Sequence, residues 1–129
     1  MTQPAPAADI ATAADLLQAY AAGQRSFSSL MLSEVDLAGA DLKGADLSYA
    51  DFCGSDLSRA NLRGADLSYA NLAEADLTGA DLRGAMLIGT NLKTTNLTQA
   101  TLAAADYDPQ ETRFPEGFDP IQQGLKRDR

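Results

Sequence analysis

The sequence has no histidine and no tryptophan, and its single cysteine is Cys53. Without histidine, a Ser-His-Asp triad, an imidazole base and a histidine-ligated metal are excluded. One cysteine forms neither an internal disulfide nor a thiolate zinc site, which favours a reducing compartment and predicts a cytoplasmic protein. No apolar run approaches the roughly 20 residues that a membrane-spanning helix needs. The sequence therefore predicts no metal, no cofactor and no membrane association.

Basic residues are also scarce, because 10 Lys and Arg face 18 Asp and Glu, which gives a net charge of −8. Such an acidic balance repels phosphates and argues against direct nucleic-acid binding. A length of 129 residues suits one domain, and the hydrophobic share of 45% lies in the globular range.

An apolar residue recurs at every fifth position from Phe27 to Leu102, which gives 16 uninterrupted registers, and Tyr107 extends the series. A small residue precedes most of them by two positions, and Asp or Asn precedes most by one. A step of five forms no single face on a helix and alternates sides on a strand. The chain must therefore turn once per repeat, so that each Leu and each small residue points inward.

Longer repeats suggest how many pentapeptides close one turn. The heptapeptide GADLSYA occurs at 44–50 and again at 64–70, which indicates a superperiod of 20 residues. The Ala-Asp/Asn-Leu pattern, as in residues 40–44, resembles the pentapeptide-repeat family over residues 27–107. This resemblance implies an all-β solenoid, a right-handed quadrilateral β-helix with four repeats per coil and thus about four coils. The tail sequence YDPQETRFPEGFDP is similar to tails of cyanobacterial members and suggests a cyanobacterial source.

A stack of coils needs covers at both ends, because its end backbone is unpaired. Residues 1–8 are expected to be disordered, and residues 9–26 to form a helical cap and lead-in. Within the cap we expect a helix over 9–22. Its expected N-cap is Asp9, and its apolar residues recur at helical spacing: Ile10, Ala13, Leu17 and Tyr20.

Residues 108–129 form an irregular C-terminal tail in this interpretation, partly packed on the last coil. Three prolines argue against regular pairing there, whereas the apolar residues Phe114, Phe118 and Ile121 favour burial. Residues 126–129 are expected to be mobile.

The Asp column could supply acid–base pairs or a cation ladder, or it could serve the turns. Asn61 and Asn71 occupy the same column, and Asn offers the same hydrogen bond without a titratable proton. Turn chemistry is therefore favoured, and the chain is predicted not to be an enzyme. Cys53 is interpreted as a serine-like surface residue.

One outward strip is apolar. Tyr49 and Tyr69 are predicted to stack one coil apart, with Met86 and Ile88 on the same side of the next coil. Tyr and Met are enriched at protein interfaces, so this strip is the candidate partner-binding surface. Alternatively the stack only stabilises the sheet, or the tail covers it. Beside it runs a ladder of Lys43, Arg63 and Arg83, which is either part of the site, a small anion site or a solvated face.

The favoured function is a non-catalytic scaffold that binds a protein partner through one face of the β-helix. The alternative, raised by the family resemblance, is a DNA mimic that modulates a topoisomerase such as gyrase. Residues 27–107 carry 11 acids and 5 bases. Four coils at about 4.8 Å reach roughly 19 Å, which is shorter than one DNA turn of about 34 Å. The polar C-terminal residues 122–129 offer no hydrophobic dimer surface, so a monomer is expected.

Overall fold

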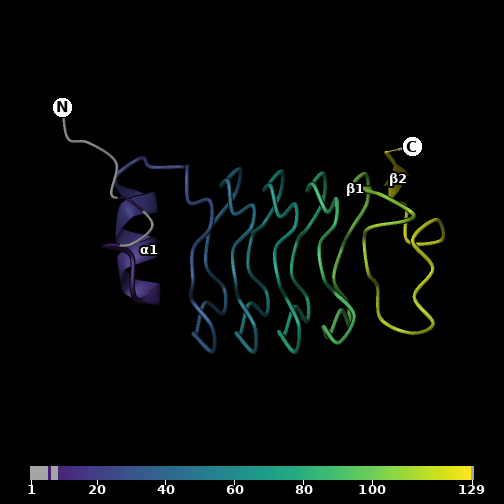
Figure 1. Cartoon of the computed structure of the whole chain (residues 1–129), viewed down its shortest axis with the longest axis horizontal. Coiled ribbons are helices and arrows are strands. Elements are labelled where there is room, and N and C mark those ends of the chain that lie inside the picture. Colours follow the sequence, from purple (N-terminus) through teal and green to yellow (C-terminus); the bar gives the residue numbers. More distant parts are fainter. Residues whose placement is uncertain (1–5, 7–8, 129) are drawn as a thin grey trace.

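The computed structural model describes residue 6 and residues 9–128, and its repeats form a stack of similar turns (Figure 1). Parallel bridges join residues 20 positions apart, from Ser26 with Asp46 up to Met86 with Asp106. One turn therefore comprises four pentapeptides, as the superperiod predicts. Helix α1, Ala13–Ala21, lies at one end of the stack, and the tail lies at the other.

The interior of the stack is built from two inward columns. Leucines such as Leu62 and Leu67 are at most 1% exposed, and the alanines two positions earlier, such as Ala60 and Ala65, are equally buried. Large and small side chains thus alternate along the interior, as close packing requires. In the first turn Leu30 takes the place of alanine and is also fully buried.

Each corner places the second residue after the central leucine in the left-handed region. Gly64 has φ 64°, but Arg59 and Tyr69 adopt φ 58° and 59°. This conformation costs a residue with a side chain about 1–2 kcal/mol, which the regular ladder offsets. Thr94 is the exception and does not adopt the left-handed conformation. The Glu74 amide donates to the Thr94 hydroxyl at 2.9 Å, whereas the amides at most other corners donate to the backbone carbonyl of the residue before the equivalent corner of the next coil.

The Asp and Asn column closes these corners. In each case an Oδ1 atom accepts the amide proton two residues later, at 3.0 Å from Ser48 to Asp46 and at 3.2 Å from Arg63 to Asn61. A charged and a neutral side chain do the same work, so the position requires a short acceptor. The contacts favour the interpretation of this column as turn chemistry.

Helix α1 is shorter than predicted. Thr12 caps it by accepting the Asp15 amide at 3.0 Å, so the expectation of a helix over 9–22 that starts at Asp9 is wrong. Leu16 is fully buried while Leu17 is 36% exposed, which also corrects the predicted buried face. The buried face is the one that carries Leu16 and Tyr20, and the Tyr20 hydroxyl bonds to the repeats.

A hydrogen bond holds α1 against the repeats. The Tyr20 hydroxyl donates to the carbonyl of Lys43 at 2.6 Å, and the Arg25 guanidinium lies 3.6 Å from the centre of the Tyr20 ring. No helix within residue 6 and residues 9–128 has the length and apolar character of a membrane span.

The tail pairs more regularly than its prolines suggest. Strand β1, Asp106–Tyr107, pairs in parallel with strand β2, Lys126–Arg127. The expectation of mobility at 126–129 is therefore wrong for Lys126 and Arg127. Arg113 also bridges Asn91. The prolines lie outside these pairs, which leaves the necessary amides free to donate.

Burial in the tail is only partly as expected. The Phe114 ring meets Tyr107 edge-on at 5.6 Å and stacks on Phe118 at 4.8 Å, but Ile121 is 60% exposed, so its expected burial is wrong. The expectation of disorder for residues 1–8 concerns residues that, apart from Pro6, lie outside the described part of the chain, as does Arg129.

We expect Leu67→Ala to lower the free energy of unfolding by about 2–5 kcal/mol, because it opens a cavity in a closely packed interior. Asp66→Asn should lower the free energy of unfolding much less. Asn keeps an oxygen acceptor for the Ser68 amide, which in the wild type lies 2.9 Å from Oδ1 of Asp66. Urea denaturation of the two variants measures both costs. Equal costs would mean that the inward and outward columns are wrongly assigned.

A candidate protein-binding face

The two tyrosines stack as predicted. Tyr49 and Tyr69 stand at equivalent corners of successive turns, with ring centres 5.3 Å apart and ring planes 16° apart. Both have left-handed backbones, and they are 60% and 45% exposed. The pair presents an ordered aromatic surface to solvent.

Met86 and Ile88 continue this surface on the next turn. The Tyr69 amide donates to the Ile88 carbonyl at 2.8 Å, and Asp66 bridges Met86. Met86 is 42% exposed and Ile88 is half-buried. The structure therefore brings the four predicted residues onto one face, and we call Tyr49, Tyr69, Met86 and Ile88 the apolar strip.

Gly89 makes room for the Tyr69 ring. A Cβ atom at Gly89 would lie 2.3 Å from Cε1 of Tyr69, so no side chain fits without moving the ring. The repeat pattern gave Gly89 no functional role. Its signal was the corner column Tyr49, Tyr69, Gly89, in which the third member is the smallest residue.

The tail is hydrogen-bonded to the strip through the Tyr69 hydroxyl. Tyr69 donates to Oε2 of Glu111 at 2.6 Å, and this hydrogen bond to a carboxylate raises the pKa of Tyr69 above its usual value. Phe114 and Phe118 pack instead against the core at the end of the stack. Of the two alternatives, the structure thus leaves Tyr49, Tyr69 and Met86 exposed rather than covered by the tail's aromatic residues.

The basic ladder is only partly neutralised. Arg83 makes a two-point contact with Asp81, at 2.9 Å from Nε and 2.7 Å from the terminal nitrogen, which lowers the pKa of Asp81 to about 2. Within residue 6 and residues 9–128, Lys43 and Arg63 make no ion pair. Of the three cations of the ladder, only Arg83 is paired with a carboxylate in the described part of the chain.

The ladder and the strip flank the same face. Turns at 43–44 and 48–49 are successive corners of the chain, so Lys43 stands at the corner where this face begins and Tyr49 at the corner where it ends. Met86 lies between the two columns. The face therefore combines an apolar edge, Met86 in a central column that also holds Asp46, Asp66 and Asp106, and a cationic border.

Comparison with known proteins places the fold. A family model described as pentapeptide repeats, with eight copies, matches residues 26–59 and 60–99. The chain belongs to the pentapeptide-repeat family, whose members fold as right-handed quadrilateral β-helices. No curated protein matches the chain.

Three solved structures are similar to this chain, and the first agrees with this assignment. The crystal structure of alr5209, a pentapeptide repeat protein from Nostoc PCC 7120, is 48% identical, with a TM-score of 0.89 over 98% of this chain and 99% of that chain. HetL, from Nostoc sp. strain PCC 7120 and involved in heterocyst differentiation regulation, is 42% identical over 74% of this chain and 46% of its own, with a TM-score of 0.32. A pentapeptide repeat protein of the Arabidopsis thaliana thylakoid lumen is 37% identical over 65% and 55%, with a TM-score of 0.48.

Gly89→Ala should destabilise the protein more than Gly84→Ala. Both glycines have φ near 70°, so both variants suffer backbone strain, but a Cβ at Gly84 meets nothing within 4 Å. We expect an extra cost of about 1–3 kcal/mol at Gly89 from displacement of the Tyr69 ring. In a Tyr69→Ala background this extra cost should vanish in urea denaturation, and equal costs for the two glycines would show that the ring yields freely.

The carboxyl of Asp81 should titrate near pH 2 in carbon-detected NMR. Because the folded pKa is lowered, the ion pair stabilises the fold above the ordinary carboxyl pKa of about 3.9 and loses this effect as the pH falls toward 2. Arg83→Gln should raise the pKa toward its ordinary value. Arg63→Gln, one turn away, is the control and should leave the pKa of Asp81 unchanged. An equal rise of this pKa in the two variants would show that the shift comes from the net charge of the protein and not from the ion pair.

Proposed function

We propose that the protein is a non-catalytic scaffold that binds a protein partner through the apolar strip and its cationic border. The observation that carries this proposal is the exposed, stacked pair of Tyr49 and Tyr69 with Met86 beside it. Tyr and Met supply large contact areas, and few such residues carry most of the energy of an interface.

The strip is ordered before it binds. The tyrosines already stack, and the contacts of Tyr69 with Gly89 and Glu111 restrict its ring. A side chain that is fixed in advance loses less conformational entropy when a partner packs on it. The free cations of Lys43 and Arg63 favour a partner with an acidic rim around an apolar centre.

The scaffold in this proposal is a rod of four coils over residues 27–107. Helix α1 and its lead-in cap one end, and the tail from residue 108 covers the other. We further propose that the rod is monomeric and acts in the cytoplasm. A rigid rod of this kind displays side chains at fixed intervals, which suits binding rather than catalysis.

Capture from the native lysate tests the strip. Tyr49→Ala with Met86→Ser should abolish retention of the partner that the wild type retains, because both side chains are exposed and lie outside the tail contact. The same variant should keep the wild-type melting temperature within a few degrees, because small surface changes cost little.

The matched control is Asp56→Asn with Asp76→Asn on the opposite face. These changes remove two charges but keep the acceptors for the Ser58 and Thr78 amides, so the corners should stay intact. Retention should be unchanged. Loss of retention in this control, together with inhibition of gyrase supercoiling by the wild type, would instead support the DNA-mimic alternative.

A further inference from the structure

One face of the last coil has an open backbone ladder. One coil earlier, the Leu77 amide donates to the Asn96 carbonyl at 2.9 Å and the Gly79 amide donates to the Thr98 carbonyl at 2.8 Å. At the equivalent positions, the amides of Leu97 and Gln99 have no hydrogen-bond partner among residue 6 and residues 9–128. The stack thus ends here with two donors aimed along its axis.

The tail pairs with the three other faces at this end. The Lys126 amide donates to the Ala105 carbonyl at 2.8 Å, and the Leu92 amide donates to the Arg113 carbonyl at 2.7 Å. On the remaining side, the Ala104 amide donates to the Gly124 carbonyl at 2.9 Å, whereas the Leu102 amide has no hydrogen-bond partner among residue 6 and residues 9–128. The face of residues 95–99 is therefore the one on which the tail pairs with neither ladder amide.

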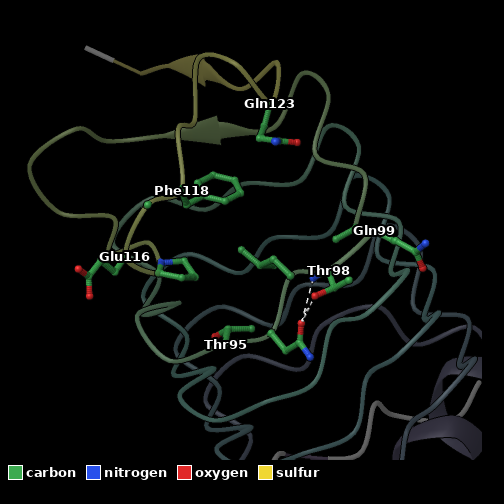
Figure 2. A pocket seen from close by; sticks show the side chains of 11 residues that line it. Thr95, Thr98, Gln99, Glu116, Phe118 and Gln123 are labelled. Carbon is green, nitrogen blue, oxygen red and sulfur yellow. Dashed lines mark hydrogen bonds between the residues drawn. The ribbon is translucent and has the colours of Figure 1, made fainter.

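A cleft of about 450 Å³ occupies the space that the tail leaves. Figure 2 shows Thr95 and Thr98 on the coil side of the cleft and Phe118 and Glu116 on the tail side. The volume falls within the roughly 300–1,000 Å³ of ligand-binding clefts. Leu97 and Phe118 are both half-buried, so each still has apolar surface to cover.

We propose that this cleft binds an extended peptide segment of a protein partner, which adds a parallel strand to the open ladder. An unpaired sheet edge is a template for strand addition, in which backbone hydrogen bonds give affinity and alternate side chains give specificity. A new strand would accept from the Leu97 and Gln99 amides, as the chain does in the coil before. One of its side chains would enter the space between Leu97 and Phe118.

The spacing of the inward residues and the side chains that line the cleft define the preferred peptide sequence. Most inward positions hold a small residue and, two positions later, a leucine, so the same spacing should fit the added strand. Glu116 is the one charged residue among the described residues that line the cleft, which favours a basic residue in the peptide. The segment 59–64, Arg-Ala-Asn-Leu-Arg-Gly, combines these features and serves as a synthetic probe.

A partner segment fits better than a second copy of this chain. Stacking two rods end to end would bring the helical end of one copy to this cleft, and α1 already lies against that end. A single extended strand needs no such displacement. This site is separate from the apolar strip, and its test does not depend on the strip.

Amide hydrogen exchange by NMR on the full chain tests the proposal with this hexapeptide. Added at about 1 mM, it should slow exchange at Leu97 and Gln99 by at least about tenfold, because both amides become hydrogen-bonded. The tyrosines of the strip should be unaffected. A control peptide with aspartate in place of leucine should give no protection.

Charge reversal at Glu116 provides the second arm. Glu116→Lys should weaken peptide binding about two- to fivefold, as expected for an exposed ion pair. Glu34→Lys makes the same charge change at an exposed corner of the first coil, at the other end of the stack, and should leave the affinity unchanged.

Three outcomes would overturn the proposal. One is equal protection by the two peptides, and another is protection confined to Tyr49 and Tyr69. The third is protection of Leu97 and Gln99 without peptide that rises with protein concentration, since it would place a second copy in the cleft.

Discussion

The parallel hydrogen-bonded ladder between residues 20 positions apart is the constraint on which the rest of the structure depends. It requires each coil to repeat the path of the coil before it, so each central apolar side chain lies over another. The interior is therefore narrow and is filled mainly by leucine and alanine, and Phe52 is the larger residue at one central position. Functional variety is confined to outward positions and to the two ends.

The corners show how much the ladder tolerates. Arg59, Tyr69 and Gln99 adopt left-handed backbones that glycine would occupy without strain. This tolerance allows tyrosines at the corners, where they can stack between coils and reach solvent. Thr94, which has a branched Cβ, avoids that conformation and restores the lost bond with its hydroxyl. The exposed tyrosine stack thus exists because ladder bonds offset strain at Tyr49 and Tyr69.

The period of five residues predicted the turn, the inward columns and the neighbours of Tyr49 and Tyr69, because each follows from repetition alone. The ends could not be read in this way. The start of α1 depends on which side-chain oxygen accepts an unpaired amide of the first helical turn. The Thr12 hydroxyl accepts the Asp15 amide, so Thr12 and not Asp9 is the N-cap. The path of the tail depends on contacts with the finished stack, so neither the Glu111 contact nor the cleft over Leu97 had a periodic signal.

The constant separation of 20 residues also bears on how the chain folds. Every ladder contact closes a loop of the same modest length. Each new coil therefore costs the same loop-closure entropy and gains the same set of hydrogen bonds. Folding of such a stack begins at any pair of neighbouring coils and proceeds by addition of the next. The bond from Tyr20 to the carbonyl of Lys43 spans a similar separation of 23 residues. Helix α1 can therefore dock as soon as the first coil closes, without waiting for the distant tail.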